Sequence, residues 1–341
     1  MNITSKEIAR LAGVSRSTVS RVVNGYDNVP EKTRVKIQAI IDQYGYVPDR
    51  SARELAGKKS AEIELFIMDD HLRWKGMASP YFMRLISELI NVCRRCSCFL
   101  TTEVLSGEDL ITPIRTAYES RKLTGGIFVG FEYHSDAMRK LMSEGYPMVL
   151  IDPDPDLEMT DKATVIRTEN EKAGYLAARW LLQKGHRQIL HLAGDDRLSA
   201  RQRREGFRRA MAETGMPEEA ILEDFGRFDS ARAGQVMQTW LTFYRDHPFT
   251  AVFADSDAMA IAAIRAIEKS GRRVPEDISV VGCDYTLFYE ELGFTLDSVD
   301  IPLEDISEYA VRFLLGQESE HSKLCRVYLK PGETAADCRE A

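Results

Sequence analysis

The spacing of apolar residues changes along this chain, and its first part has the spacing of three short helices. Thr4 and Glu7 form a capping-box pattern that opens a first helix, because each side chain reaches a backbone N–H that the helix leaves without a partner. A second helix is expected over about 16–23, capped by Ser15, and a third over about 31–44. The residues expected to close a small shared core are Ile8, Ala12, Val14, Val19, Val22, Val35, Ile37, Ile40 and Ile41.

From Ser60 onward, short apolar runs alternate with helix-like stretches. The runs are EIELFIMDD, SCFLTTEV, GGIFVGF, PMVLIDPDP, ATVIRT, QILHLAG, TAVFADS and ISVVGCD. Continuous apolar runs are typical of parallel strands buried on both faces, and the helices between them imply right-handed crossovers. The body is therefore expected to be α/β and doubly wound.

Several of these runs end in small or acidic residues. They are Asp69-Asp70, Asp152, Gly194-Asp195, Asp255-Ser256-Asp257 and Asp284. Ligands of open α/β sheets bind at the carboxyl ends of the strands. The sequence therefore predicts a binding cleft at these positions.

The second predicted helix has a polar outer face made of Arg16, Ser17, Ser20 and Arg21. An arginine fork bonds O6 and N7 of guanine, and hydroxyls reach bases or phosphates, so this face suits a recognition helix in a DNA major groove. A helical hairpin with a solvated polar face has the same pattern. The segment that follows the third helix offers Asp49 as the cap of a short helix over about 50–56, which is too short to be stable without a partner.

The charge distribution separates the two parts of the chain. Residues 1–60 hold eleven Lys and Arg against six Asp and Glu, a net +5, whereas the whole chain of 341 residues carries −8 and the remainder therefore −13. A basic segment neutralises DNA phosphates, and an acidic body avoids clinging to DNA through its other faces. The length implies more than one domain, and 44% hydrophobic residues suffice for a large core.

Residues 3–60 resemble the headpiece and hinge of the lactose-repressor and galactose-repressor family of bacterial transcription regulators. The resemblance rests on EIARLAGVSRSTVSRVVNG, TRVKI and YGYVPDRSARELAGKKS, in this order. It implies that the hinge helices of two subunits lie side by side in the minor groove and that a leucine, here Leu55, wedges into the central base step. The remaining chain resembles the effector-binding core of the same family, with its clearest blocks at KGHRQILHLAG, SARQRREGF, ADSDAMAIAAIRAIEKSGRRVPEDISVVGCD and KPGET.

The resemblance implies an N-terminal all-α helix-turn-helix headpiece at 1–46, a hinge helix or linker at 47–59, and a two-lobed α/β core similar to periplasmic binding proteins at 60–341. Three chain crossings between the lobes are expected. Lobe one is expected at about 61–159 and 291–320, and lobe two at about 160–290 and 321–341. Contacts with operator DNA are expected from Ser5, Ser15, Arg16, Ser17, Thr18, Ser20, Arg21, Asn24, Arg50, Ala52, Arg53 and Leu55.

The same resemblance places a small-molecule effector in the cleft. Arg203, Asp284, Ser256 and Asp152 match pocket positions of the family, while Asp257 is expected to cap the next helix. Carboxylates accept from vicinal hydroxyls and an arginine fork donates to two oxygens, which suits a sugar. Aromatic side chains that suit the faces of a pyranose ring are Tyr81, Phe82 and Phe228.

Other functions remain open at this point. A nucleobase corepressor is the alternative within the family, and a nucleotide-binding α/β enzyme is the alternative outside it. The enzyme is disfavoured because Gly57-Lys58-Lys59-Ser60 follows no strand, Ala52 replaces the first glycine of a phosphate loop, and no GxGxxG follows a predicted strand.

The run CRRCSC suggests metal or redox chemistry through Cys93, Cys96 and Cys98, but a fourth ligand with suitable spacing is missing. We therefore expect no metal, no cofactor and no catalytic residues. No apolar run approaches the roughly 20 residues of a membrane span, and the N-terminus has no signal-peptide core. The interpretation is a cytoplasmic repressor. A homodimer is preferred because the C-terminal tail lacks the heptads of a tetramer coiled coil.

Overall fold

The computed structural model divides the chain into two compact units, residues 1–61 and 62–341. The described residues are 3–23, 26, 28–46, 60–68, 79–107, 109–131, 134–153, 157, 160–218, 221–286 and 293–338. The predicted hinge at 47–59, the predicted DNA contact Asn24 and the strand-end residues Asp69-Asp70 lie outside them.

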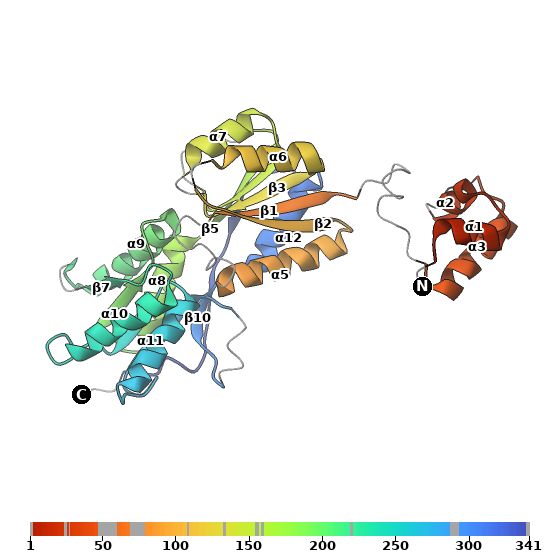
Figure 1. Cartoon of the computed structure of the whole chain (residues 1–341). Helices are drawn as coiled ribbons and strands as arrows, with labels where there is room; N and C mark the ends of the chain where they lie inside the picture. Colours follow the sequence, from red (N-terminus) through yellow and green to blue (C-terminus); the bar gives the residue numbers. More distant parts are fainter. Residues whose placement is uncertain are drawn as a thin grey trace. The chain divides into compact units, whose positions relative to one another are not determined.

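In the described part of the N-terminal unit there are three helices, α1 Ser5–Ala12, α2 Arg16–Val23 and α3 Glu31–Tyr44 (Figure 1). The capping box is formed as predicted: the Thr4 hydroxyl oxygen accepts from the Glu7 backbone N–H at 3.3 Å, and Glu7 Oε2 accepts from the Thr4 backbone N–H at 2.8 Å. Gly13 ends α1 with φ +68°, a conformation that glycine adopts without steric cost. The sequence therefore sets the bounds of these helices locally.

The core of this unit differs from the prediction at one position. Ile8, Ala12, Val19, Val22 and Ile37 are buried, and Val14, Ile40 and Ile41 pack against them. Val35, however, is 59% exposed, so its predicted core role is wrong. The reason is that the buried face of α3 contains Ile37, while Val35 lies on the opposite, outer face. Val29, in the loop before the helix, is buried in the core instead.

Lobe one of the second unit is a six-stranded parallel sheet with the strand order β11-β5-β4-β3-β1-β2. Its helices α6 and α7 pack on one face of the sheet, and α12 packs against α5 (Figure 1). Its elements are β1 Glu62–Met68, α5 Pro80–Arg95, β2 Phe99–Leu105, α6 Ile111–Arg121, β3 Gly125–Val129, α7 Ser135–Ser143, β4 Met148–Ile151, β5 Ala163–Thr168, α12 Leu303–Leu314 and β11 Ser322–Cys325.

Lobe two is a second six-stranded sheet with the order β12-β10-β9-β8-β6-β7, parallel except for β12. Helices α10 and α11 share an apolar core with one face of this sheet, and α8 and α9 pack against each other. Its elements are α8 Asn170–Gln183, β6 Ile189–Ala193, α9 Leu198–Ala212, β7 Leu222–Phe225, α10 Ser230–Thr242, β8 Ala251–Ala254, α11 Asp257–Lys269, β9 Ser279–Asp284, β10 Asp297–Asp300 and β12 Tyr328–Lys330.

The chain crosses between the lobes after β5, after β10 and after β11. Three crossings were expected, but at other positions: β5 and β11 belong to lobe one, and β10 belongs to lobe two. The lobe boundaries expected near 160, 291 and 320 therefore need correction. An apolar run identifies a buried strand, but it does not say which of two similar sheets the strand joins.

Candidate functional site

The polar face of α2 is available to solvent in the N-terminal unit. Arg16, Ser17 and Arg21 are exposed and Ser20 is partly buried, while Val19 and Val22 are buried against the core. The predicted recognition surface of α2 is thus presented outward.

Side chains around the start of α2 are linked to one another. The Ser15 hydroxyl lies 2.7 Å from that of Ser17 and 2.8 Å from that of Thr18, and it accepts from the Thr18 backbone N–H at 3.2 Å. Arg16 Nε donates to the Ser5 hydroxyl at 3.1 Å. The start of α1 and the start of α2 therefore form one polar patch. Asn24, Arg50, Ala52, Arg53 and Leu55 lie outside the described residues.

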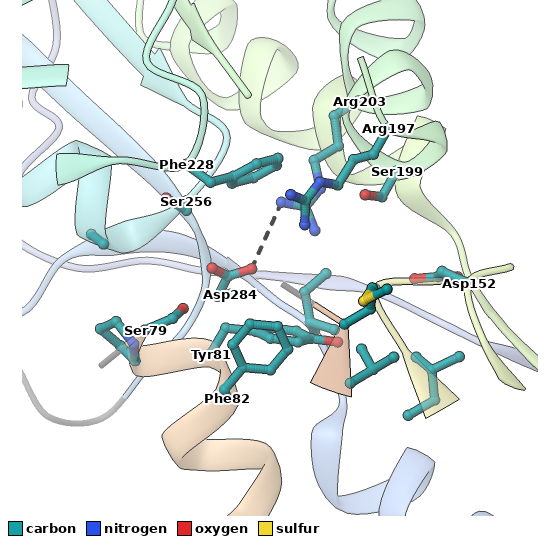
Figure 2. Close-up of a pocket in the computed structure, with 17 residues that line it drawn as sticks. Ser79, Tyr81, Phe82, Asp152, Arg197, Ser199, Arg203, Phe228, Ser256 and Asp284 are labelled. Atoms are coloured by element: carbon teal, nitrogen blue, oxygen red, sulfur yellow. Dashed lines mark ion pairs between the residues drawn. The ribbon is translucent and has the colours of Figure 1, made fainter. Parts of the chain in front are cut away.

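A pocket lies between the two lobes of the second unit, at the carboxyl ends of strands from both sheets (Figure 2). All the predicted effector residues line it, namely Tyr81, Phe82, Asp152, Arg203, Phe228, Ser256 and Asp284. The apolar walls are completed by Met68, Val129, Ile151 and Ile301. The strand-end rule therefore located the pocket, although the sequence could not show that both sheets contribute to one cavity.

Arg203 on α9 is the centre of the polar wall. It is buried, its Nε donates to Asn170 Oδ1 at 3.1 Å, and its Nη1 donates to the carbonyl oxygen of Asp255. Nη1 also lies 3.7 Å from the carboxylate of Asp284 (Figure 2). Arg203 is therefore not part of a solvated helix face, whereas Arg201 on the same helix is exposed.

Asp284 closes the end of β9 with φ +110°, a backbone conformation that costs free energy for any residue with a Cβ. Its side chain is buried. Burial raises the pKa of Asp284 well above its ordinary value, and the nearby Arg203 offsets this only in part. A buried carboxyl group held in a strained backbone next to a guanidinium is an acceptor that gains from a donating ligand.

Asp152 lies at the end of β4 and connects the lobes. Its Oδ1 accepts from the Thr168 backbone N–H at 2.7 Å, and its Oδ2 accepts from Asn170 Nδ2 at 3.2 Å. Burial raises the pKa of Asp152, although these two partners favour its ionised form. Asn170 also accepts from Arg203, so Asp152 and Arg203 share one partner across the first crossing.

Ser256 was expected in the pocket and Asp257 as the cap of the next helix, but it is Ser256 that caps the helix. Ser256 lines the pocket but is also the cap of α11, since its hydroxyl accepts from the Met259 backbone N–H at 3.3 Å. Asp257 was expected to be the cap, and instead its buried carboxylate accepts from Ser298 at 2.6 Å and from the Thr286 backbone N–H at 2.7 Å. A serine before an aspartate at a helix start fits either assignment, and only the position of β10 decides between them.

The aromatic residues stand on two sides of the cavity. Tyr81 and Phe82 begin α5 in lobe one and contact each other edge to face, with ring centroids 5.4 Å apart. Phe228 comes from lobe two and lies opposite them across the cavity in Figure 2. Its ring packs so closely over Gly194 that an added Cβ there would lie 2.3 Å from Phe228 Cε2.

In lobe two, the sequence analysis missed the polar pocket residues Arg197 and Ser199, and in lobe one it missed Ser79. Arg197 forms a bidentate pair with Asp195, with Nε at 2.8 Å from Oδ1 and Nη2 at 2.8 Å from Oδ2, and its guanidinium lies 4.8 Å from the Phe228 ring centre. For Arg197 and Ser199 the signal was present, because both residues follow the Gly194-Asp195 strand end that was named as a cleft position.

The cysteines are free and show no arrangement for a metal. Cys93, Cys98, Cys283 and Cys325 are buried. Among the residues that the structure describes, no group of three His, Cys, Asp or Glu side chains is placed to hold a metal ion. No helix in the described part of the chain has the length and apolarity required to cross a bilayer.

An N-terminal helix-turn-helix unit followed by a two-lobed α/β core with a cleft is the architecture of a bacterial transcriptional regulator. Residues 4–49 match the family described as bacterial regulatory proteins, lacI family, and residues 178–334 match the periplasmic binding protein-like domain. The chain is 30% identical over 315 residues to the HTH-type transcriptional regulator CelR of Thermobifida fusca, covering 92% of this chain and 91% of CelR. It is 31% identical over 329 residues to the HTH-type transcriptional repressor PurR of Vibrio parahaemolyticus serotype O3:K6, covering 94% of each.

Solved structures agree. A lac repressor dimer bound to operator and the anti-inducer ONPF superimposes with a TM-score of 0.78 at 25% identity, covering 98% of this chain and all of that chain. A CelR–cellobiose complex superimposes with a TM-score of 0.68 at 26% identity and the same coverage. The chain belongs to the LacI family of bacterial regulatory proteins, and it is a transcriptional regulator rather than an enzyme.

Proposed function

We propose that this chain is a transcriptional repressor that binds an approximately palindromic operator as a homodimer and changes its affinity when a small molecule occupies the pocket. The observation that carries the proposal is the pairing of an outward polar face on α2 with a two-lobed pocket in the same chain. The lac repressor comparison, a dimer on operator DNA, supports the dimeric assembly. Because a bacterial repressor acts on DNA, a cytoplasmic location is part of this proposal.

A sugar is the effector class that the pocket supports best. Asp152 and Asp284 offer acceptors to hydroxyl groups, Arg197 and Arg203 offer donors, and Phe228 offers a face for the apolar side of a pyranose. The comparison with a cellobiose complex of CelR points the same way.

A nucleobase is the second candidate. The specific observation is that Phe228 lies across the cavity from Tyr81 and Phe82, so a flat ring would contact aromatic side chains on both sides (Figure 2). Asp284 and Arg197 would then bond the edge of the base. The two candidates differ in whether the ligand presents many hydroxyls or one planar edge.

Operator recognition is tested by selecting bound duplexes from a random DNA library with the full chain. The expected result is enrichment of a site with two inverted half-sites about one helical turn apart. Recovery of unrelated sequences with equal affinity would refute the proposal of a sequence-specific repressor.

Effector class is tested by thermal unfolding of the full chain against a panel of sugars and nucleobases. A ligand at 100 times its Kd adds about 2.7 kcal/mol to the folded state, enough to raise the Tm clearly. Hits confined to sugars support the first candidate, and hits confined to nucleobases support the second. Each hit is then added to the selected operator complex, where the affinity must change.

A further inference from the structure

A histidine in the interior of lobe two has no role in the pocket as described so far. His191 is the middle residue of β6, and its side chain is fully buried. Its ring forms a cluster with those of Phe207 of α9 and Phe253 of β8, with centroid distances from His191 of 4.6 Å and 5.0 Å. The neighbouring residues Leu190 and Leu192 belong to the apolar core shared with α10 and α11, as the alternation of a strand requires.

Both ring nitrogens of His191 face carboxylates. Nδ1 lies 3.2 Å from Glu223 Oε2, and Nε2 lies 3.0 Å from Asp255 Oδ1. A neutral imidazole has one donor and one acceptor nitrogen, whereas an ionised carboxylate only accepts. Two carboxylate partners are therefore both satisfied only when the imidazole carries two protons and a positive charge.

One of these carboxylates connects His191 to the pocket. Asp255 Oδ2 accepts from the Gly194 backbone N–H at 2.7 Å, and Gly194 is the residue over which Phe228 packs. The carbonyl oxygen of Asp255 accepts from Arg203 Nη1. The position of Asp255 therefore affects both the arginine and the aromatic side chain that line the pocket.

The other carboxylate leads outward. Glu223 on β7 accepts from Arg208 Nη2 at 3.0 Å, and Arg204 Nη1 lies 3.9 Å from the same oxygen. The charged groups nearest to His191 are thus the carboxylates of Asp255 and Glu223. The guanidinium groups of Arg204 and Arg208 lie beyond Glu223, and that of Arg203 lies beyond Asp255. Negative and positive groups therefore alternate along this network, and each charge is stabilised by neighbours of opposite sign.

We infer that His191 is an imidazolium ion at neutral pH and a positioning residue of the pocket, because its charge holds Asp255, and Asp255 in turn holds Arg203 and the Gly194 amide. The positioning role rests on the proposed effector pocket, whereas the charge state does not.

The pKa shifts agree with this assignment. Burial alone would lower the pKa of His191, but the carboxylates of Asp255 and Glu223 outweigh it and raise the pKa above its ordinary value. The pKa of Glu223 is lowered, because its hydrogen bond to His191 and the nearby guanidinium groups outweigh its own burial.

His186 is an internal comparison in the same lobe. It is also buried, but its ring nitrogens face the Thr250 hydroxyl at 2.9 Å and the Ala336 carbonyl oxygen at 3.0 Å. A hydroxyl can donate, so a neutral ring satisfies both partners, and burial lowers the pKa of His186. Two buried histidines of one lobe should therefore differ in charge.

The charge is tested by ¹⁵N nuclear magnetic resonance of the full chain labelled at its six histidines, with assignments from the variants His191→Gln and His186→Gln. At pH 7 we expect both ring nitrogens of His191 to be protonated and His186 to be a neutral tautomer. In Asp255→Asn the titration midpoint of His191 should fall by about 1 to 3 pH units, the usual effect of an opposite charge at this distance. A neutral His191 at pH 7, or a midpoint unchanged in Asp255→Asn, would overturn the inference.

The positioning role is tested on the Arg203 Nε–H resonance in the same full chain without ligand. In His191→Gln we expect it to shift or broaden, while in His186→Gln it should stay in place. An Arg203 resonance that moves equally in both variants would indicate general loosening of the lobe and would refute the positioning role. These measurements need no effector, so failure of the operator or ligand tests above is distinguishable from failure of this inference.

Discussion

Arg203 is the single residue on which the polar contacts of the pocket converge. Its guanidinium connects Asn170 at the first crossing, the carbonyl of Asp255 and the carboxylate of Asp284. Because Arg203 contacts both the interlobe segment and the strand ends, a ligand in the cavity should change its contacts with both.

Replacing Arg203 by Ala should therefore remove the response to effector while DNA recognition by the N-terminal unit persists. The ligand-induced rise in Tm for any hit of the panel should fall towards zero, and operator affinity should become insensitive to that hit. Arg201→Ala, an exposed arginine on the same helix, is the matched control and should keep both responses. A ligand-induced shift of unchanged size in Arg203→Ala would exclude this residue from the binding site.

Asp257 should make the stability of the chain depend on pH. Burial raises its pKa to about 6, above the value of about 3.9 in an unfolded chain, so its stabilising contribution is complete below about pH 4 and is lost as the pH rises through about 6. From about pH 4 to about pH 7, urea unfolding should show the wild type losing about 2 kcal/mol relative to Asp257→Asn. Asp136→Asn, at a fully solvated carboxylate, should show no such difference, and parallel curves for Asp257→Asn and wild type would contradict the prediction.

For single residues, the sequence predicted the role correctly where a residue type has one common role at its position, and it did not where two roles are equally common. Carboxylates at strand ends led to Asp152 and Asp284, because parallel strands end at one edge. Ser256 and Asp257 could each be a cap, and their hydrogen bonds depend on β10, which is distant in sequence. Arg197 was missed because its orientation depends on Asp195 and on the Phe228 ring.

At the scale of elements, α8 and α9 are held unusually close by glycine. A Cβ added to Gly206 would lie 1.7 Å from the carbonyl oxygen of Glu171, and one added to Gly174 would lie 1.8 Å from that of Arg203. The helix that carries Arg203 therefore depends on a backbone contact that no other residue type permits.

Gly206→Ala should accordingly destabilise the chain by about 1–3 kcal/mol or more, because the two helices must separate. Gly234→Ala is the matched control in α10, where the nearest atom to an added Cβ is 4.0 Å away, and it should stabilise by about 0.5–1 kcal/mol. Urea unfolding of both variants measures this. Effects of equal sign and size would mean that the helix contact is not the cause.

The hinge segment is an element for which the prediction rests on sequence, since Leu55 lies outside the described residues. An apolar wedge bends the duplex, and the bend allows further protein–DNA contacts only at a site that bends easily. Leu55→Ala should therefore lower the affinity for the selected operator about tenfold or more, which corresponds to about 1.4 kcal/mol. Affinity for random DNA, measured at the same salt concentration, should change little. Equal losses on both DNAs would contradict the wedge.

The strands that sequence analysis did not predict share a simple property. β7, β10, β11 and β12 read LEDF, DSVD, SKLC and YLK, so none is a continuous apolar run. β7, β11 and β12 are edge strands, where one side faces no neighbouring strand and a polar sequence is tolerated. Seven of the eight strands predicted from apolar runs lie inside the sheets, which is why their sequences identify them, whereas the eighth, β2, is an edge strand that is mostly only partly buried.

At the scale of the whole core, one arginine of lobe one binds the backbone of lobe two. Arg84 Nη1 donates to the carbonyl oxygens of Asp284 at 2.8 Å and Tyr285 at 2.9 Å. It also donates to Asp300 Oδ1 at 3.1 Å, next to the second crossing. Since α5 carries Tyr81 and Phe82, these bonds join the helix that bears one aromatic side of the pocket to lobe two.

Arg84→Met should therefore weaken the association of the lobes and destabilise the chain by about 1–3 kcal/mol, because the partly buried carboxylate of Asp300 and the two backbone carbonyl oxygens lose a charged donor. Hydrogen exchange should accelerate at 284–286 and 300–303. Arg95→Met is the matched control, since Arg95 lies on the same helix and pairs with Glu308 at the surface, where such pairs contribute about 1 kcal/mol or less. Unchanged exchange in Arg84→Met would show that other contacts hold the lobes together.

The order of the strands along the chain also determines when each part of the protein can fold during translation. Each lobe receives a strand from the last twenty residues described, β11 for one sheet and β12 for the other. During synthesis, helices α1 to α3 are complete after about 44 residues, whereas each lobe is complete only after its last described strand, β11 or β12, has been made. A ribosome that stops after α12 would thus release a chain whose DNA-reading part is intact and whose sensing part has two unfinished sheets. Such a fragment would be a target for proteases and would lack the means to respond to a metabolite.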